Sequence, residues 1–324
     1  MTFAIRFHQT GGPEVLRWEE VSVGAPAAGE ARVRHEAVGL NFIDTYHRTG
    51  LYPMPLPSGI GLEGAGIVEA VGEGVSDIQV GDRVAYAGGP VGAYSQVRCM
   101  PAHRLLKLPA SIDFRTGAAM MLQGMTAAYL LRRTYRVQPG DAVLIHAAAG
   151  GVGLIACQWA KALGATVIGT VSTEAKAELA RQHGCDHVIL YTREDIVKRV
   201  RELTGGEGVA VVYDGVGKDT FAASLDCLRP RGMMATFGNA SGAVPAFDPL
   251  TLTQKGSLFL TRPKLADYTS RRDELLDIGQ ELFNVVVGGQ VKIEVNQTYP
   301  LSEAAQAHRD LEARKTTGST IFLP

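Results

Sequence analysis

The sequence has few cysteines, and no two of them lie close together. Cys99, Cys157, Cys185 and Cys227 are 58, 28 and 42 positions apart, so the chain contains no C-x-x-C pair. This spacing indicates neither a compact zinc site nor a disulfide-linked module. We therefore expect reduced thiols and a cytoplasmic protein.

An excess of charge and long apolar runs are also missing. The 32 Lys and Arg residues against 33 Asp and Glu residues leave a formal net charge of −1, so there is no overall basic field to attract nucleic acid. No apolar run reaches the roughly 18–20 residues that span a bilayer, and the first ten residues, MTFAIRFHQT, lack the apolar region of a signal peptide. These absences argue against membrane and nucleic-acid partners.

Glycine is the residue in surplus. The 38 glycines make up about 12% of 324 residues, where ~7% is typical. At roughly 100–200 residues per domain, the length favours two domains, each large enough for a hydrophobic core. The positions of the glycines then help to indicate what each domain does.

The pattern along the chain predicts an inserted domain. Up to residue 122, short β-like runs alternate with Gly and Pro turns, which favours a β barrel or sandwich. These runs are Ala31–Val38, Gly66–Val71, Arg83–Ala87 and Tyr94–Val97. Mixed character returns at residue 262 and continues to a terminal strand at Ser319–Leu323. We expect residues 1–122 and 262–324 to fold together around a domain formed by residues 123–261.

The inserted stretch alternates strands and helices. Apolar runs typical of strands occur at Ala142–His146, Thr166–Thr170, Val188–Tyr191, Gly208–Tyr213, Met233–Phe237 and Ser257–Thr261. Helical patterns lie between them, and the one that includes Phe221 is expected to stop at Pro230. Strands that alternate with helices predict an α/β fold with a doubly wound parallel sheet.

A glycine-rich segment joins the first strand of this stretch to its helix. Gly150, Gly151 and Gly153 lie there, although alanine fills the first position of the usual G-x-G-x-x-G pattern. Glycine lets backbone N–H groups approach a pyrophosphate, and the helix N-terminus adds partial positive charge. The segment predicts a dinucleotide site; a tight turn without a ligand is the alternative.

The second strand favours NADP(H) over NAD(H). An acidic residue at its tip would bind the ribose 2′-hydroxyl, but the strand continues into Ser172 with no acid at the tip. Ser172 can donate to a 2′-phosphate and Lys176 can neutralise it, although Lys176 is also compatible with a solvated position. Glu174 is expected to face solvent. Tyr191, at the end of the third strand, would flank the adenine or be a core aromatic.

The segments described so far, together with others along the whole chain, resemble a known family. The run from Gly140 through Gly150-Gly151-Val152-Gly153 to Lys161, and segments such as Asn41–Tyr46, Glu63–Gly66 and Phe237–Asn239, are similar to the zinc-free quinone oxidoreductases (zeta-crystallin group) of the medium-chain dehydrogenase/reductase superfamily. The bacterial NADPH:quinone reductases are the nearest comparison. The resemblance implies a Rossmann domain inserted in a GroES-like β-barrel catalytic domain.

The same comparison predicts a site without metal. Zinc alcohol dehydrogenases of the superfamily carry a cysteine where this chain has Asn41, and a His-Glu pair where it has Leu62-Glu63. Without thiolate or imidazole at these positions a tetrahedral zinc site cannot form there. Quinones and α,β-unsaturated carbonyls suit such a site, because their own conjugation spreads the incoming negative charge.

The resemblance also implies the roles of single residues. Asn41 and Tyr46 would line the cleft near the nicotinamide and Tyr52 its mouth, with the tyrosines either donating a proton to the quinol or only shaping an apolar slot. A purely structural hydrogen bond in the loop is the alternative role of Asn41. Asp44 is expected to orient its loop. The residues implied to bind NADPH are Asn41, Tyr46, Thr126, Gly150, Gly151, Val152, Ser172, Lys176, Tyr191, Val216, Gly238, Asn239, Ser241, Thr261 and Arg314.

The sequence therefore predicts an NADPH-dependent quinone reductase. The alternatives are an enone or enoyl-thioester reductase, and a cofactor-bound protein with a crystallin-like or AU-rich-RNA-binding role. The RNA alternative rests on a thin cluster of arginines at Arg132, Arg133 and Arg136. The apolar run at residues 257–261 is expected to be an edge strand, and the resemblance implies that it pairs with its copy in a homodimer.

Overall fold

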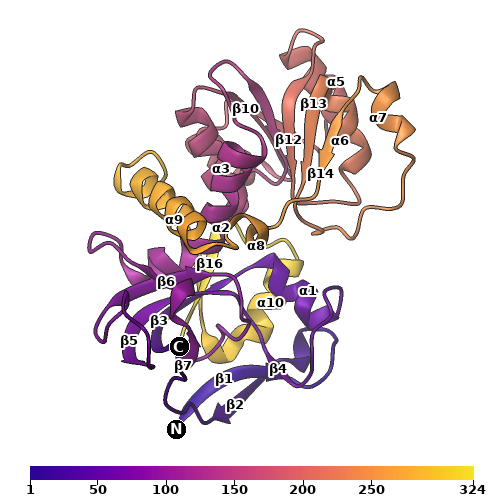
Figure 1. The fold of residues 1–324 in the computed structure, drawn as a ribbon. Coiled ribbons are helices and arrows are strands. Elements are labelled where there is room, and N and C mark those ends of the chain that lie inside the picture. The colour runs from indigo at the N-terminus through magenta and orange to yellow at the C-terminus, as the bar shows by residue number, and fades with distance from the viewer. The chain divides into compact units, whose positions relative to one another are not determined.

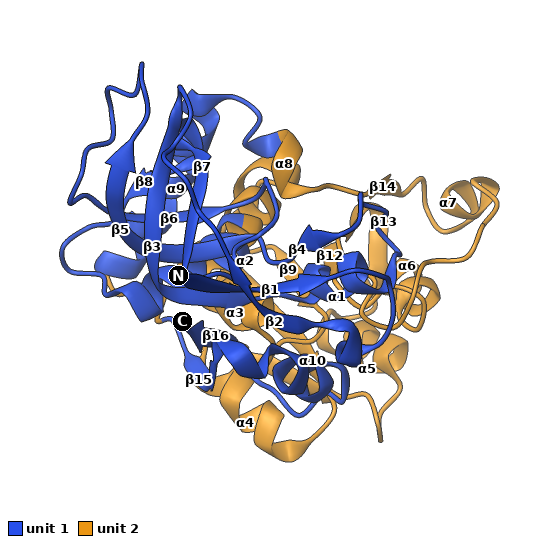
Figure 2. Cartoon of the chain, turned by 90° about the horizontal axis from the view of Figure 1, so that it is seen from below, with its two compact units in different colours: residues 1–125, 268–287, 293–324 blue, residues 126–267, 288–292 orange.

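The computed structural model describes all residues from 1 to 324, and they form two compact units (Figure 2). Unit 1 comprises Met1–Met125, Tyr268–Val287 and Ile293–Pro324, and unit 2 comprises Thr126–Asp267 and Gly288–Lys292. The units thus divide after Met125 and Asp267, where the sequence placed domain limits after residues 122 and 261. The predicted domain limits after residues 122 and 261 are therefore still a prediction.

Unit 1 is built on two sheets. A small antiparallel sheet has the order β2-β1-β4, and a larger one has the order β15-β16-β3-β5-β6-β8, with β7 paired to β3. The C-terminal strand β16 runs antiparallel beside β3, so residues from the two ends of the chain form one sheet. The strands are β1 (Thr2–Phe7), β2 (Arg17–Val21), β3 (Glu30–Leu40), β4 (Ser58–Gly59), β5 (Glu63–Val71), β6 (Arg83–Ala87), β7 (Val97–Pro101), β8 (Leu106–Lys107), β15 (Val295–Pro300) and β16 (Ser319–Leu323).

Helices flank these strands in the sequence. They are η1 (Pro13–Val15), α1 (Phe42–Thr49), η2 (Ala102–Arg104), α9 (Arg272–Val287), η4 (Leu301–Glu303) and α10 (Ala304–Glu312). Two further helices, α2 (Phe114–Tyr129) and α8 (Leu265–Tyr268), contain residues of both units. The core of unit 1 includes Phe7, Tyr94 and Phe322, all fully buried.

The strand expected at Tyr94–Val97 was wrong. The strand of this region, β7, begins only at Val97. Tyr94 instead exchanges backbone hydrogen bonds with two separate segments, donating to Ile60 O and accepting from Ile5 N, and Ser95 Oγ donates to Gly92 O at 3.1 Å. Because these bonds go to different partners, the alternating pattern of these residues does not become a ladder.

Unit 2 contains one parallel sheet of six strands, of which Figure 1 labels β10, β12, β13 and β14. Its order, β11-β10-β9-β12-β13-β14, is that of a doubly wound dinucleotide-binding sheet, as predicted. The strands are β9 (Ala142–Ile145), β10 (Thr166–Val171), β11 (His187–Leu190), β12 (Val209–Asp214), β13 (Leu228–Thr236) and β14 (Phe259–Thr261). Strand β12 is buried at every position, as expected of a strand covered on both faces.

Helices connect the strands of this sheet: η3 (a π-helix, Leu130–Thr134), α3 (Gly151–Ala162), α4 (Glu174–Gln182), α5 (Ile196–Leu203), α6 (Phe221–Cys227) and α7 (Leu250–Gln254). Helix α6 ends at Cys227, before Pro230, which lies inside β13. Proline therefore does not stop this helix, and the expectation at that point was wrong. Pro230 lies in the part of β13 before Met233, where pairing with β14 begins, so its missing N–H removes no bond of that ladder.

Candidate functional site

The carboxyl ends of the six parallel strands of unit 2 gather most of the predicted cofactor residues. Parallel strands end at a common edge of the sheet, so the segments that follow them are neighbours. The segments after β9, β10, β11, β12 and β13 hold Gly150–Val152, Ser172, Tyr191, Val216 and Gly238–Ser241 respectively, and β14 ends at Thr261. The topology thus brings together residues spread over more than a hundred positions.

The glycine segment between β9 and α3 is tightly built. A Cβ atom on Gly153 would lie 2.3 Å from Ala147 O and 2.8 Å from Ala148 Cα, so only glycine fits without backbone movement. Ala147 itself has a φ of 53°, a conformation that L-residues other than glycine rarely adopt. This strained turn aims the start of α3 toward the edge of the sheet.

Helix α3 begins with unused donors. Leu154 N–H is hydrogen-bonded to Gly150 O at 2.9 Å, and the N–H groups of Gly151, Val152 and Gly153 precede this first helical bond. Gly150, the N-cap residue, offers no side chain to satisfy them. Three N–H groups at a helix N-terminus are suited to an anionic group such as a pyrophosphate.

The ends of β10 and β11 lie side by side. Tyr191 N–H donates to Val171 O at 3.2 Å, and Thr192 Oγ1 donates to Ser172 O at 3.1 Å. Thr173 caps α4 by accepting from the N–H of Lys176, which places Lys176 in the first turn of that helix. Ser172, Lys176 and Tyr191 therefore belong to one small region.

Glu174 begins α4, between Ser172 and Lys176 in the sequence. It is exposed and pairs with Arg193 at 3.2 Å, in agreement with its expected solvent-facing position. Its carboxylate is thus engaged by Arg193, which follows Tyr191 by two residues.

A buried aspartate organises the ends of β12 and β13. Asp214 accepts hydrogen bonds from the N–H groups of Val216 and Gly217 and from Thr220 Oγ1, at 2.7–3.1 Å. Ser241 N–H donates to Val216 O at 2.8 Å, and a Cβ on Gly238 would lie 2.3 Å from Gly215 O. Sequence reasoning missed Asp214, although a carboxylate that closes the apolar strand Val209–Asp214 was a visible signal.

Thr126, the remaining predicted cofactor residue of unit 2, does not follow any strand of the sheet, so the strand order does not bring it to the carboxyl ends of the strands. Thr126 is buried on α2. Arg262, just after β14, was not predicted; it donates to Gly238 O at 3.1 Å and so braces the segment that carries Gly238 and Asn239.

In unit 1, helix α1 carries two of the predicted catalytic residues. Asn41 is the buried N-cap of α1, and its N–H donates to Asp44 Oδ2 at 2.9 Å. Tyr46 lies on the same helix, and Tyr52 follows it, with its N–H donating to Tyr46 O at 3.0 Å. The two tyrosine rings meet edge to face, with centroids 5.2 Å apart. The structure therefore brings Asn41, Tyr46 and Tyr52 onto one helix and its following turn.

Arg314 belongs to the same unit but is not part of this group. It is exposed, two residues after the end of α10, and has a φ of 59°.

Asp44 is the centre of a buried polar network that ties α1 to α10. Its Oδ2 also accepts from Tyr94 Oη at 2.8 Å, and Tyr94 Oη lies 3.2 Å from His308 Nε2 on α10. Arg48 donates to His308 Nδ1 at 3.0 Å and forms a two-point ion pair with Glu312, at 2.6 and 3.0 Å. Since Arg48 always donates, neutral His308 accepts at Nδ1 and donates from Nε2, so the bonds point toward Asp44. Asp44 thus links the N-cap of α1 to Tyr94, an arrangement compatible with the expected role in orienting its loop.

Burial shifts the pKa of several of these groups. It raises the pKa of Asp44 to about 7, although hydrogen bonds from Asn41 and Tyr94 lower it. Burial, followed by the nearby charge of Arg48, lowers the pKa of His308 to about 3. The Oδ1 atom of Asp44 is buried without a hydrogen-bond partner, a natural position for a proton on this carboxyl.

A second buried network holds the Asn41 side chain, and sequence reasoning did not find it. Glu63 on β5, Gln123 on α2 and Ser319 on β16 form a hydrogen-bonded chain with the Asn41 amide. Burial raises the pKa of Glu63 to about 8, while hydrogen bonds from Asn41 and Leu122 lower it. Glu63 was noted only as the residue after Leu62 in the comparison with zinc enzymes.

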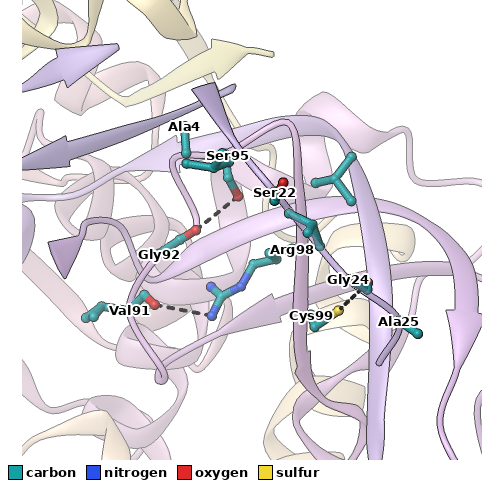
Figure 3. A pocket seen from close by; sticks show the side chains of 12 residues that line it. Ala4, Ser22, Gly24, Ala25, Val91, Gly92, Ser95, Arg98 and Cys99 are labelled. Carbon is teal, nitrogen blue, oxygen red and sulfur yellow. Dashed lines mark hydrogen bonds between the residues drawn. The ribbon is translucent and has the colours of Figure 1, made fainter. Parts of the chain in front are cut away.

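An open hollow of about 410 Å³ lies elsewhere on unit 1, between the segment Val21–Ala25 and strand β7 (Figure 3). Its buried Arg98 donates to Pro90 O and Val91 O at 3.0 and 3.3 Å, and Cys99 Sγ faces Gly24 O at 3.6 Å. Arg98 and Cys99 are thus engaged with backbone oxygens. None of the predicted site residues lines it.

No three His, Cys, Asp or Glu side chains form a group that could hold a metal ion. No helix is both long and apolar enough to cross a bilayer.

Two family descriptions match the chain. Residues 27–110 match the alcohol dehydrogenase GroES-like domain, and residues 151–263 match the zinc-binding dehydrogenase family. The first match lies within unit 1 and the second within unit 2.

Similar proteins cover the whole chain. A quinone oxidoreductase of Pseudomonas aeruginosa is 54% identical over the full length of both chains, and a 2-haloacrylate reductase of a Burkholderia species is 51% identical over all of this chain and 99% of its own. The crystal structure of Escherichia coli quinone oxidoreductase complexed with NADPH superposes with a TM-score of 0.98 at 53% identity, covering 99% of this chain and all of that one.

Proposed function

Because the chain belongs to the quinone oxidoreductases of the medium-chain dehydrogenase/reductase superfamily, we propose that it reduces quinones with NADPH. The observation that carries the proposal is the similarity, at 53% identity and over essentially the whole fold, to a quinone oxidoreductase whose structure contains NADPH. The site described above supplies the residues for each part of that activity.

The edge of the unit 2 sheet fits a dinucleotide. The space that a Cβ on Gly153 would fill, and the three unused N–H groups at the start of α3, suit a pyrophosphate that lies close to the backbone. NADPH, when bound, supplies the hydride. Gly150, Gly151 and Val152 would hold its phosphates, and the residues near Asp214, namely Val216, Gly238, Asn239 and Ser241, would hold the part that crosses the sheet, with Thr126, Thr261 and Arg314 as further contacts implied by the family.

Ser172 and Lys176 would select the phosphorylated dinucleotide. A hydroxyl donor and an amine at the tip of β10 can bind a 2′-phosphate, whereas a 2′-hydroxyl offers no negative charge for the amine to neutralise. Tyr191 is placed beside Ser172 and would flank the adenine.

In unit 1, Asn41, Tyr46 and Tyr52 would contact the nicotinamide and the quinone. The edge-to-face packing of the two tyrosines makes a flat, largely apolar wall that suits a quinone ring and excludes water. Either tyrosine hydroxyl can donate a hydrogen bond to a quinone oxygen as it gains electron density, and a role limited to shaping the slot is the alternative.

We propose that the reaction needs no metal. Asn41 offers an amide and Leu62 an aliphatic side chain where zinc enzymes of the superfamily have a thiolate and an imidazole, and neither can bind zinc. Polarisation would then come from hydrogen-bond donors, which is sufficient for an acceptor whose conjugation spreads the charge.

The reduction of an activated double bond is a second candidate. A relative that is 51% identical over the whole chain is a 2-haloacrylate reductase, so the scaffold is compatible with an α,β-unsaturated acid. Both reactions add hydride to a conjugated acceptor, and the same pocket residues would serve either one.

Steady-state assays with NADPH and four acceptors decide between the candidates. We expect 1,4-benzoquinone and 9,10-phenanthrenequinone to give a kcat/KM well above that of 2-chloroacrylate and crotonyl-CoA. If kcat/KM is higher for the acrylate or the thioester, the proposed function is wrong and the protein is a double-bond reductase.

We further propose a homodimer and a cytoplasmic location. Strand β14 is the last strand of its sheet, and Phe259 on it is 59% exposed, which is unusual for an edge that stays unpaired. Pairing with the same strand of a second copy would cover it. The four cysteines are free thiols, as expected of a reducing compartment.

A further inference from the structure

The side chain of Asn41 lies in the middle of a buried chain of hydrogen bonds within unit 1. Ser319 Oγ donates to Gln123 Oε1 at 2.7 Å, Gln123 Nε2 donates to Asn41 Oδ1 at 3.2 Å, and Asn41 Nδ2 donates to Glu63 Oε2 at 2.6 Å. All four residues are at most 8% exposed. They come from β16, α2, the start of α1 and β5, so the chain of bonds joins four separate elements.

Glu63 is the last acceptor in this series of hydrogen bonds, and its carboxyl group has little freedom to move. Its other oxygen, Oε1, accepts the N–H of Leu122 at 2.8 Å. On the opposite side, a Cβ on Gly39 would lie only 2.3 Å from Oε2, so the carboxyl is packed directly against the backbone of β3. An ionised carboxylate accepts hydrogen bonds and donates none, so it requires the nitrogen of the Asn41 amide to face it.

The same four side chains can also form their hydrogen bonds in the opposite donor-to-acceptor direction. If Oε2 of Glu63 carries a proton, it can donate to Asn41 Oδ1 once the amide has turned over. Asn41 Nδ2 then donates to Gln123 Oε1, and Gln123 Nε2 donates to Ser319 Oγ. Ser319 completes the chain by donating to Ala119 O, which lies 2.9 Å from its Oγ. The side chains of the chain keep partners in both directions, but the turned Asn41 amide no longer accepts the Asp44 N–H that it accepts in the capping box of α1, and that N–H keeps only Asn41 O. The proton at Glu63 must therefore outweigh this one bond to turn the amide.

The ionisable groups that act on Glu63 come from three other places in the unit. They are Asp44 on α1, Tyr86 on β6 and Tyr94 before β7, and Asp44 raises the pKa of Glu63 by like charge. Burial is the larger effect and raises the pKa of Glu63 to about 8, so the protonation of Glu63 changes within the pH range of an activity assay.

We propose that Glu63 is a positioning residue which, in its ionised form, fixes the direction of the Asn41 amide through the chain to Gln123 and Ser319. Glu63 uses one of the two N–H groups of that amide. When the amide turns over, its second N–H and its carbonyl oxygen exchange places, and a ligand oxygen that received a hydrogen bond then meets an acceptor. This inference rests on the proposed function, in which Asn41 contacts the nicotinamide or the quinone.

Glu63→Gln tests the proposal and keeps every hydrogen bond of the chain, at the cost of the capping-box bond from the Asp44 N–H to the Asn41 side chain. The introduced amide oxygen accepts from Leu122, and its NH2 group donates to Asn41 Oδ1, which holds the chain permanently in the opposite direction. We expect a melting temperature close to that of the unmodified protein at pH 6.5. We expect kcat at pH 8.5 to fall roughly tenfold or more, the scale of losing one oriented donor.

The pH profile separates positioning from a structural role. In the unmodified protein, kcat should rise with pH as Glu63 loses its proton, whereas in Glu63→Gln kcat should stay at the acid value of the unmodified protein. Glu69→Gln is the matched control, because Glu69 lies on the same strand but pairs with Arg32 and Arg34, each at 3.3 Å; it should retain the normal profile. In Asp44→Asn the rise should also persist, since Glu63 remains.

Two results of the assay would overturn the proposal. One is a Glu63→Gln protein with the kcat and pH profile of the unmodified protein. The other is loss of the rise in Asp44→Asn, which would assign the titration to Asp44.

A measurement on the unmodified protein covers the case in which Glu63→Gln does not fold. The side-chain NH2 resonances of Asn41, assigned by their loss in Asn41→Asp, should shift between pH 6 and 9.5 as the amide turns over. Resonances that do not shift would refute the inference. This experiment needs no turnover, so it judges the network even if the unmodified protein fails to reduce quinones, which would refute the proposed function alone.

Discussion

Gly153 shows at the scale of one residue how the dinucleotide edge depends on backbone contact. In Gly153→Ala, the new Cβ would lie 2.3 Å from Ala147 O, and the neighbouring atoms are backbone that cannot rotate away. We expect a loss of about 1–3 kcal/mol in the free energy of unfolding, and weaker NADPH binding because the start of α3 must shift. Urea denaturation and fluorescence titration with NADPH measure the two effects.

Gly24→Ala is the control for this substitution, since a Cβ on Gly24 has no atom within 4 Å. It should leave both measurements nearly unchanged. Normal NADPH affinity in Gly153→Ala would show that the close approach of this turn does not matter for the cofactor.

Lys176 carries the prediction on cofactor choice. In Lys176→Glu, a carboxylate would face the 2′-phosphate in place of an amine. Since a hydrogen bond to a charged group contributes about 1.5–3 kcal/mol, KM for NADPH should rise roughly ten- to a hundredfold, with KM for NADH nearly unchanged. Arg181→Glu makes the same charge change further along α4, where Arg181 pairs only with Glu178 at 3.6 Å, and should affect neither cofactor. Equal effects of Lys176→Glu on NADPH and NADH would contradict the 2′-phosphate role.

Buried ionisable residues of unit 1 predict how stability depends on pH. Burial raises the pKa of Asp44 to about 7 and of Glu63 to about 8, so the folded protein holds these protons more tightly than the unfolded chain does. Their contribution to stability therefore decreases as pH rises from about 4 to 8. His35 and His308, whose pKa values burial lowers to about 4 and about 3, have the opposite effect, but only below about pH 6.5.

Between pH 6.5 and 8.5 the carboxyl contribution decreases, and thiols such as Cys227, whose pKa burial raises to about 12, act in the same direction near the upper end of the range. The free energy of unfolding in urea should decrease over this range, and the decrease should be smaller in Glu63→Gln, which cannot titrate at this position. A free energy that is constant or rises from pH 6.5 to 8.5 would mean that these carboxyls are ionised throughout.

At the scale of elements, α10 is tied to α1 by a nearly buried ion pair. Arg48 is 1% exposed and Glu312 is 35% exposed at the side chain. Glu312→Gln leaves the Arg48 charge buried with a weaker partner, and we expect a loss of about 1–3 kcal/mol in the free energy of unfolding, less than the roughly 3–5 kcal/mol of a fully buried pair. Because Arg314 follows α10 by two residues, KM for NADPH should rise as well.

Glu178→Gln is the matched control for this pair, since its partner Arg181 is also largely exposed. An exposed pair of this kind contributes about 0–1 kcal/mol. A Glu312→Gln protein as stable as this control would show that α10 is held by its apolar contacts alone.

Helices and strands could be predicted where local sequence patterns determine them, and were missed where contacts with distant segments determine them. Most strands of unit 2 were predicted to within two residues because apolar periodicity and glycine turns are local signals. Strand β13 is the exception, since it begins at Leu228 and was expected to begin at Met233. The strand expected at Tyr94–Val97 failed because Tyr94 bonds to segments around Ile5 and Ile60, which the local pattern does not contain. The same reason explains why Pro230 was expected to end a helix and instead lies in β13.

The same distinction holds for the site. Gly150, Gly151 and Ser172 could be proposed from the sequence because the motif and its chemistry are contiguous. The partners of the Asn41 amide could not, because Glu63, Gln123 and Ser319 are brought together only by the pairing of β16 with β3 and by the packing of α2, with Gln123 and Ser319 196 positions apart. Asp214 is an intermediate case. The sequence shows a carboxylate at the end of a strand, but no known motif marks it as functional.

At the scale of the whole molecule, the edge strand β14 predicts the oligomeric state. Phe259→Lys places a charge on the exposed edge, which opposes pairing with a second copy. Light scattering should give twice 34.5 kDa for the unmodified protein and 34.5 kDa for this variant. Leu276→Lys, on the exposed side of α9, is the control and should remain dimeric. A dimeric Phe259→Lys protein would place the interface elsewhere.

The central claim, that the protein transfers the reducing equivalents of NADPH to a quinone, is tested most directly by an anaerobic stoichiometry. The purified protein is mixed with NADPH and excess 1,4-benzoquinone, and NADPH oxidised and hydroquinone formed are both quantified against a reaction without protein. We expect protein-dependent formation of one hydroquinone per NADPH oxidised. No acceleration over the protein-free reaction, or oxidation of NADPH only when an unsaturated acid or thioester replaces the quinone, would contradict this account.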